Sequence, residues 1–183
     1  MTYFKRIIGE KCYLSPFCKD EIEKITGWSN DKDVYSTTLY AHKLVSLNQQ
    51  EELLKDKTNT FSIVDLETNN LLGHTGIFDI DNINRKANFG IIIGNKKFHG
   101  KGYGQEATKL ILDFAFNILN FNNIFLSVFS YNTKGYNCYK KIGFKEIGRR
   151  RKSWFYGGKY YDEIYMDLLV DEFNKKYETI FKP

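Results

Sequence analysis

The stretch that decides the fold runs from Asn88 to Ala107 and reads NFGIIIGNKKFHGKGYGQEA. It begins as an apolar strand, continues through a loop in which Gly100, Gly102 and Gly104 alternate, and ends in an amphipathic helix. Glycine tolerates a positive φ and lets the backbone approach a ligand closely. The first N–H groups of a helix have no internal acceptor and lie at the positive end of its dipole. The stretch therefore predicts a site for a phosphate-bearing ligand.

The loop differs from two well-known nucleotide-binding motifs. GKGYG has the form G-x-G-x-G, so it lacks the last spacing of the dinucleotide fingerprint, and no acidic ribose-binding context follows it. A phosphate-binding loop of the nucleoside triphosphatase kind needs a glycine where this chain has Asn95, and Ser or Thr where it has Gly102. Taken alone, the glycines also fit an ordinary turn between a strand and a helix.

Composition indicates a folded protein of ordinary size. A chain of 183 residues is long enough to bury a real core, and we expect it to form one domain. Hydrophobic residues make up 42% and aromatic residues 16%, which favours a globular chain over a disordered one. No apolar run reaches membrane-spanning length and no signal peptide opens the chain. The three cysteines lack metal-ligand or redox spacing, so we expect a cytoplasmic protein without a bound metal.

Positive charge raises the question of a nucleic-acid partner. The formal net charge is +5, and the run from Arg149 to Lys152 is entirely basic. Binding to phosphates without sequence preference needs several such groups on one face. The alternative is a solvated, charged segment between two strands, with Glu146 and Asp162 nearby to balance it. Because the chain holds no known nucleic-acid module, we favour the second interpretation and expect no nucleic-acid partner.

The apolar pattern predicts alternating strands and helices. Val34 to Ala41 fits either a short helix or a loop, Gly27 fits the end of a first helix, and Asn48 fits an N-cap. The predicted strands are 11–15, 61–66, 71–79, 87–93, 123–129, 144–147 and 160–168. The predicted helices are 19–27, 48–54, 105–119, 134–142 and 170–177. This order predicts an α/β protein with a mixed sheet and helices on both faces.

The second half of the chain resembles a known family. The segment 132–144, NTKGYNCYKKIGF, resembles the N-x-x-A/G-x-x-x-Y-x-x-x-GF segment of the GNAT superfamily of N-acetyltransferases. HGKGYG at 99–104 is similar to that family's pyrophosphate loop, Q/R-x-x-G-x-G/A. GEKCYLSP at 9–16, WSND at 28–31 and GGKYYDEIYM at 157–166 resemble the ribosomal-protein-alanine and spermidine acetyltransferase branch. The resemblance covers roughly residues 8–169 and leaves a short C-terminal helix within 170–183.

The resemblance implies a single acetyltransferase domain over residues 1–183 with acetyl-CoA as co-substrate. It implies a central, mostly antiparallel sheet in which the strands 87–93 and 123–129 are parallel neighbours that splay apart. The pantetheine arm would pair with the first of them, because its amides can mimic an added strand. The cofactor-binding residues implied are Ile91, Ile92, Ile93, Phe98, His99, Gly100, Lys101, Gly102, Tyr103, Gly104, Gln105 and Asn132.

The chemistry of acetyl transfer needs an oxyanion site and an acid. Main-chain donors near Ile92 would hold the tetrahedral oxyanion, and one such donor lowers the activation free energy by about 3 kcal/mol. Tyr139 matches the family's tyrosine and is the predicted general acid for the leaving thiolate. Tyr136, three residues away, is the alternative. Asn132 would cap the helix that begins near Lys134 and, by resemblance, also bond the cofactor arm.

The general base has no obvious candidate. Relatives in this branch commonly carry a glutamate where this chain has Asn88, in ANFG, and other family members carry one where it has Ser127. Neither residue accepts a proton as a carboxylate does. Asp79, Asp81 or a chain of waters would replace it, or the amine would react through its small neutral fraction, roughly one part in a thousand at pH 7.

The amine acceptor stays open at this point. We expect an amine from a protein N-terminus, with a polyamine, an amino sugar or an aminoglycoside as alternatives. Two other readings are a non-catalytic acyl-CoA-binding domain and a basic nucleic-acid-associated protein. A homodimer through the late strands is compatible with the sequence. Aromatic residues that could stack on a sugar or a peptide are Trp28, Tyr35, Trp154 and Tyr156. Carboxylates that could gather around a polyamine are Asp31, Asp33, Asp79 and Asp81.

Overall fold

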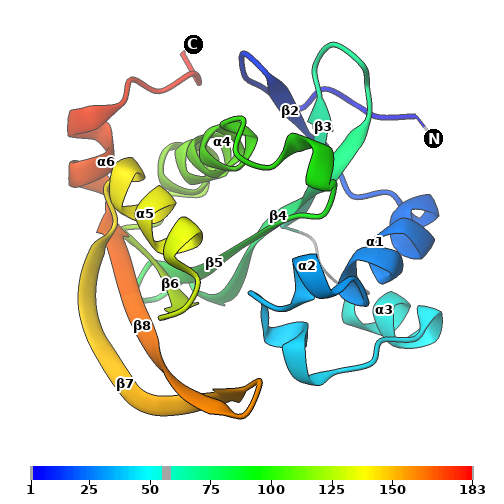
Figure 1. The fold of residues 1–183 in the computed structure, drawn as a ribbon. Coiled ribbons are helices and arrows are strands. Elements are labelled where there is room, and N and C mark those ends of the chain that lie inside the picture. Colours follow the sequence, from blue (N-terminus) through cyan, green and yellow to red (C-terminus); the bar gives the residue numbers. More distant parts are fainter. Residues whose placement is uncertain (1, 55–58, 183) are drawn as a thin grey trace. The chain divides into compact units, whose positions relative to one another are not determined.

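The computed structural model describes residues 2–54 and 59–182, and the chain in it forms two compact units (Figure 1). The first comprises Met1–Gly76 and Ile91–Leu110, the second Ile77–Gly90 and Ile111–Pro183. Three elements run from one unit into the other: strand β4 (Leu71–Asp81), strand β5 (Lys86–Ile93) and helix α4 (Tyr103–Asn117). The expected single acetyltransferase domain stays a prediction.

The first unit is built on antiparallel strands. They are β1 (Ile7–Ile8), β2 (Cys12–Pro16), β3 (Thr60–Asp65) and the first part of β4. Each pairs with the next, as in Ile7 with Leu14 and Tyr13 with Val64. Every residue of β3 is buried, as expected for a strand covered on both faces. The predicted strands 61–66 and 71–79 are confirmed as the antiparallel neighbours β3 and β4, whereas the very short β1 was not predicted.

The helices of the first unit differ from the prediction at their ends. They are η1 (Lys19–Glu21), α1 (Ile22–Ser29), α2 (Lys32–Tyr35), η2 (Leu39–His42) and α3 (Leu47–Leu54). Gly27 was wrongly placed at a helix end, because α1 continues to Ser29. Asn48 was wrongly predicted as the cap of α3 and lies inside the helix. Ser46 makes the cap instead, since its Oγ accepts from the Gln49 amide at 3.3 Å while the Gln49 side chain accepts from the Ser46 amide at 2.9 Å.

The second unit continues the sheet from β5. Its further elements are β6 (Asn123–Phe129), α5 (Thr133–Ile142), β7 (Lys145–Tyr156), β8 (Lys159–Leu169) and α6 (Val170–Lys176). The strand β6 lies where the sequence predicts it. The prediction for β7 was wrong, because this strand extends to Tyr156 and contains the basic run. The run is therefore part of a strand paired with β8, with a register shift between Arg150 and Trp154, rather than a segment between strands.

The strands are hydrogen-bonded in the order β1-β2-β3-β4-β5-β6-β8-β7. The pair β5–β6 is parallel, and the pairs β6–β8 and β7–β8 are antiparallel. Pairing of β5 with β6 joins Lys86–Asn88 to Asn123–Phe125, although both strands continue beyond these residues. The predicted mixed, mostly antiparallel sheet with a splayed parallel pair is thus confirmed. In the described part of the chain no helix has both the length and the apolar character needed to cross a membrane.

Candidate active site

The end of β5 in the first unit is held by close backbone packing. A Cβ atom on Gly73 of β4 would overlap the carbonyl oxygen of Ile92, so only glycine lets the two strands approach here. A Cβ on Gly94 would overlap the indole of Trp28, which covers this residue. Ile91, Ile92 and Ile93 are all half-buried. The backbone of the predicted pantetheine strand is therefore fixed by glycines on β4 and after β5.

The loop after β5 is tied to the strand it leaves. It contains the short helix η3 (Lys96–Phe98), which Asn95 caps by accepting from the Lys97 amide at 3.3 Å. The His99 ring lies with Nε2 2.7 Å from the carbonyl oxygen of Ile93. Because a carbonyl only accepts, Nε2 carries the proton and donates to Ile93. Of the ring nitrogens of His99, only Nδ1 is left for the predicted contact with phosphate.

Two of the three alternating glycines are required by the backbone. Gly100 has φ of +73° and Gly102 has φ of +90°, values that other residues adopt only with strain. Gly104 has an ordinary φ, and a Cβ there would make a normal contact 3.5 Å from a side-chain carbon of Ile93. The side chain of Lys101 places its ammonium 5.7 Å from the ring centre of Phe98.

The first turn of α4 is anchored by carboxylates. Oε1 of Glu106 accepts from the amides of Lys11 at 2.8 Å and Cys12 at 3.3 Å. The Tyr103 hydroxyl donates to Asp65 of β3 at 2.7 Å, and this hydrogen bond raises the pKa of Tyr103 to about 12. The residue before the helix is Gly102, which has no side chain to cap it. A glycine-shaped backbone bend before a firmly held helix start fits the pyrophosphate of acetyl-CoA.

In the second unit, Asn132 directly precedes α5 as its N-cap residue. Its side-chain oxygen accepts from the Gly135 amide at 3.0 Å, so the predicted N-cap is present. A Cβ on Gly135 would lie 2.7 Å from the side-chain nitrogen of Asn132, too close for any other residue without a shift. The glycine of the N-x-x-G pattern therefore makes room for the cap.

The two candidate tyrosines of α5 are in different environments. The Tyr139 ring packs edge-on against Phe89 of β5, with centres 6.1 Å apart, and against Phe144 at 5.9 Å. Burial raises the pKa of the Tyr139 phenol, and among the described residues none forms a hydrogen bond with its hydroxyl. The Tyr136 hydroxyl instead donates to Glu146 at 2.9 Å. Tyr139 thus keeps a proton that it can donate, whereas the hydroxyl of Tyr136 is already engaged.

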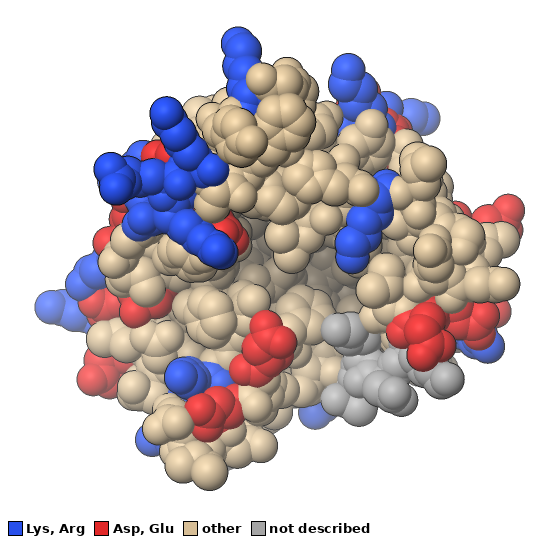
Figure 2. Space-filling model, turned by 90° about the horizontal axis from the view of Figure 1, so that it is seen from below, with Lys and Arg blue, Asp and Glu red and all other residues tan. Residues whose placement is uncertain are grey.

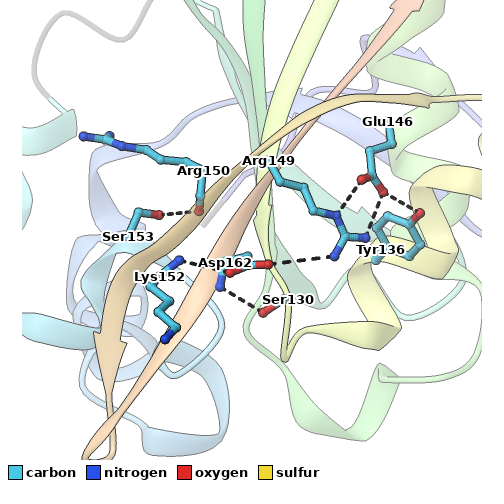
Figure 3. A network of polar contacts seen from close by, with 8 residues as sticks. All are labelled: Ser130, Tyr136, Glu146, Arg149, Arg150, Lys152, Ser153 and Asp162. Atoms are coloured by element: carbon cyan, nitrogen blue, oxygen red, sulfur yellow. Dashed lines mark hydrogen bonds and ion pairs between the residues drawn. The ribbon is translucent and has the colours of Figure 1, made fainter.

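Tyr136 belongs to a polar network that joins α5, β7 and β8 (Figure 3). Nε of Arg149 donates to Glu146 at 2.6 Å, and this contact lowers the pKa of Glu146. Asp162 accepts from the Lys152 amide at 3.0 Å, and its own amide donates to a serine hydroxyl before α5. Figure 2 shows one dense group of Lys and Arg with Asp and Glu beside it, and further Lys and Arg spread over the face drawn. Part of the basic run is thus neutralised within its own unit.

The positions without the usual acid have carboxylates as neighbours. The side-chain amide of Asn88 donates to Asp79 of β4 at 3.3 Å. Ser127 is exposed and lies opposite Tyr165 of β8, whose hydroxyl donates to Glu163 at 2.9 Å. The sequence does not reveal that Asn88 lies beside Asp79 or that Ser127 lies opposite Tyr165, because the residues of each pair are on different strands.

The aromatic residues singled out in the sequence belong two to each unit. Trp154 and Tyr156 belong to a cluster of the second unit in which Trp154 stacks on Phe129, with centres 4.1 Å apart. Tyr131 and Tyr161 complete this cluster and were not predicted. Trp28 and Tyr35 lie in the first unit, where Trp28 covers Gly94. The aromatic wall expected from the sequence stays a prediction.

Comparisons with known proteins identify the family. A family model of the GNAT acetyltransferase domain matches residues 11–145, and the chain therefore belongs to the GNAT family of acetyltransferases. It is an N-acetyltransferase with acetyl-CoA as its co-substrate, as the sequence predicted.

Two relatives bear on the acceptor. The chain is 28% identical over 164 residues to spermidine N(1)-acetyltransferase of Vibrio cholerae, which covers 87% of this chain and 94% of that protein. It is 32% identical over 102 residues to a putative ribosomal N-acetyltransferase of Bacillus subtilis, covering 56% of this chain and 55% of that protein.

A solved structure is similar over nearly the whole chain. It is the crystal structure of spermidine N-acetyltransferase from Vibrio cholerae in complex with CoA and spermine. The TM-score is 0.81 with 27% sequence identity, and the match covers 91% of this chain and 99% of that one.

Proposed function

We propose that this chain acetylates a polyamine. A primary amine of the polyamine would attack the thioester of acetyl-CoA directly, with both substrates bound together. The Vibrio cholerae relative supports this acceptor, because the match extends over most of both chains and its structure contains CoA and spermine. The expected protein N-terminus has weaker support, since the putative ribosomal relative matches little more than half of this chain. It stays the second candidate.

Acetyl-CoA binding would use backbone groups of the first unit. The residues proposed are Ile91–Ile93 for the pantetheine arm and Phe98–Gln105 for the pyrophosphate, with Asn132 of α5 as a further contact. The Ile92 carbonyl faces Gly73 of β4, and successive residues of a strand direct their backbone groups to opposite edges. The oxyanion donors expected near Ile92 are therefore the N–H groups of Ile91 and Ile93 rather than that of Ile92 itself.

Tyr139 carries the catalytic part of the proposal. Its hydroxyl has no hydrogen-bond partner among the described residues, and it carries its proton at neutral pH because burial raises a pKa that is already well above 7. The leaving thiolate of CoA is basic and needs a nearby proton donor to leave as the thiol. The packing of Tyr139 on Phe89 holds the phenol beside β5 just past the residues where this strand pairs with β6.

The test is thiol release from acetyl-CoA with a panel of amines. The panel contains spermidine, spermine, a peptide with N-terminal Ala or Ser, an amino-sugar nucleotide and an aminoglycoside. We expect turnover with spermidine and spermine at a kcat/KM at least tenfold above that for any other amine. Preference for the peptide would replace the polyamine with a protein N-terminus. Binding of acetyl-CoA by calorimetry without turnover of any amine would favour the non-catalytic alternative.

A further inference from the structure

The face of β5 that carries Asn88 also carries two consecutive residues of β4. Asn88 and Gly90 are two positions apart and share one face of the strand. The Phe78 ring covers Gly90, since a Cβ there would lie 3.0 Å from it, and Asp79 accepts from Asn88 at 3.3 Å. Phe78 and Asp79 therefore both reach this face, although neighbouring residues of a regular strand point to opposite faces.

The backbone of Asp79 explains this departure. Its φ is +49°, in the left-handed region, so the regular alternation of side chains along an extended strand is broken at this residue. Asp and Asn enter this region several times more often than most residues do. The local conformation thus turns a carboxylate towards Asn88 of the neighbouring strand.

The opposite face of β5 carries the proposed acid. Phe89 lies between Asn88 and Gly90 in sequence and points to the other face, where it contacts Tyr139 at 6.1 Å between ring centres. Pairing with β6 ends at Asn88 and Phe125. Around Asn88 and Phe89, β5 therefore has a carboxylate on one face and a phenol on the other. After Asn88 the backbone of β5 is no longer paired with β6.

We infer that Asp79 is the general base of acetyl transfer and that Asn88 positions it. This inference rests on the proposed function. The amine nitrogen forms a bond with the thioester carbon as Asp79 removes a proton from it. The tetrahedral intermediate then breaks its carbon–sulfur bond, and the thiolate takes the proton of Tyr139. Asp79 releases its proton to water and the tyrosinate regains one from water, so that amine and acetyl-CoA give the amide and CoA.

Neighbouring carboxylates are less suited to this role. Asp81 accepts from both the backbone amide and the side-chain amide of Asn84, at 2.9 and 2.7 Å, and these bonds lower its pKa. Glu163 accepts the Tyr165 hydroxyl. Asp79 is exposed and has the single amide of Asn88 as its recorded partner in the described residues. The Asn88 amide therefore orients a carboxylate that solvent and an incoming amine can reach.

The first experiment compares Asp79→Asn with Asp81→Asn. Asn keeps the shape of Asp and its tolerance of a left-handed backbone, so Asp79→Asn removes mainly the charge. We expect kcat with spermidine to fall about 100-fold or more, as for loss of a general base, with the Kd of acetyl-CoA unchanged. Asp81→Asn should stay within about threefold of the unsubstituted enzyme. Retention of a third or more of kcat in Asp79→Asn, or an equal fall in both variants, would overturn the assignment.

The second experiment tests the positioning role of Asn88 by a double-mutant cycle. Asn88→Ala should lower kcat about tenfold and leave the KM for spermidine unchanged. In the Asp79→Asn background the same change should have almost no further effect, because the residues act as a unit. Additive losses would remove Asn88 from the proposal. A large fall in Glu163→Gln with normal kcat in Asp79→Asn would transfer the role of base to Glu163.

If the unsubstituted enzyme acetylates no polyamine, the proposed function itself fails and no variant is needed to see it. If it turns polyamines over while Asp79→Asn remains fully active, the function stands and only the base is wrong.

Discussion

The starts of helices α4 and α5 differ in whether a side chain accepts from their first backbone N–H groups. Each helix follows one strand of the parallel pair and has N–H groups that lack an acceptor within the helix. At α5, Asn132 supplies the acceptor from its own side chain. At α4, the preceding residue is Gly102, which has no side chain. A capped helix start is complete by itself, whereas a start preceded by glycines can accept an anionic ligand.

The contributions that we propose for the two helices differ accordingly. The start of α4 offers backbone groups, which recognise a phosphate whatever the side chains are. The helix α5 offers one side chain, the Tyr139 hydroxyl, from a segment that its cap and the aromatic contacts with Phe89 and Phe144 hold in place. Substitutions at α4 should therefore change affinity for acetyl-CoA, and substitutions within α5 should change the rate of transfer or the stability.

The largest effect is expected from Tyr139→Phe. The ring keeps its contacts with Phe89 and Phe144 while the acidic proton is lost, so kcat should fall about 100-fold or more with the Kd of acetyl-CoA unchanged. Steady-state kinetics and calorimetry measure the two quantities. Tyr136→Phe is the matched control and should stay within about twofold. A smaller loss for Tyr139→Phe than for Tyr136→Phe would exchange their roles.

Gly102→Ala should weaken acetyl-CoA binding about tenfold or more. A non-glycine residue at φ of +90° is strained by roughly 1–3 kcal/mol, so the loop would adopt another conformation. Calorimetry with acetyl-CoA gives the change in Kd. Gly148→Ala is the control, because Gly148 has no positive φ and a Cβ there meets no atom within 4 Å. Equal affinities of the two variants would show that the loop does not need its left-handed backbone to bind the ligand.

Tyr103→Phe separates the anchoring of α4 from ligand binding. Loss of the hydrogen bond to Asp65 should lower the free energy of unfolding by about 1.5 kcal/mol at pH 7, with little change in acetyl-CoA affinity. Burial raises the pKa of Asp65, but hydrogen bonds from Thr68 and Tyr103 outweigh it and hold that pKa below the usual value. A lowered folded-state pKa means stability that is present above the unfolded-state pKa and is lost as pH falls through the folded-state value.

Urea denaturation at a series of pH values therefore checks this prediction. The difference between the unsubstituted protein and Tyr103→Phe should be full at pH 7 and should shrink below about pH 4. A difference that does not depend on pH would mean that the hydroxyl, rather than its bond to a charged carboxylate, is responsible.

The smallest effect is expected from Asn132→Ala. Loss of the N-cap of α5 should cost about 1 kcal/mol of the free energy of unfolding. The control is Asn137→Ala, an exposed position inside the same helix, where Ala is the better helix former. Urea denaturation of both variants measures the difference. If Asn132→Ala were no less stable than Asn137→Ala, the contrast between a capped and an uncapped helix start would lose its energetic basis.

Sequence was sufficient where a local pattern determines the structure. The strand Asn123–Phe129 is a short, mostly apolar run of strand-forming residues, and the glycines at 100 and 102 permit the positive φ found there. It was insufficient where a partner lies far along the chain. The strand β7 was predicted too short because its basic run shows no apolar alternation. Pairing with β8 stabilises this part of the strand instead.

The candidate site follows the same division. The motif alone suggested Tyr139, but the engagement of Tyr136 with Glu146 depends on a strand beyond the helix. The contact of His99 with Ile93 and that of Asn88 with Asp79 likewise join residues whose proximity no spacing rule predicts. The left-handed conformation of Asp79 was also invisible, since no glycine marks it.

Position 79 must meet two independent conditions, a left-handed backbone and, in the proposed reaction, a group that accepts a proton. Glycine or asparagine would keep the bend of β4 but supply no base, and glutamate would supply a base but resist the bend. Aspartate meets both conditions. In activity only aspartate should be accepted at this position, whereas in stability asparagine and glycine should be accepted as well. A complete substitution series at a single codon would then separate what the fold requires from what the reaction requires.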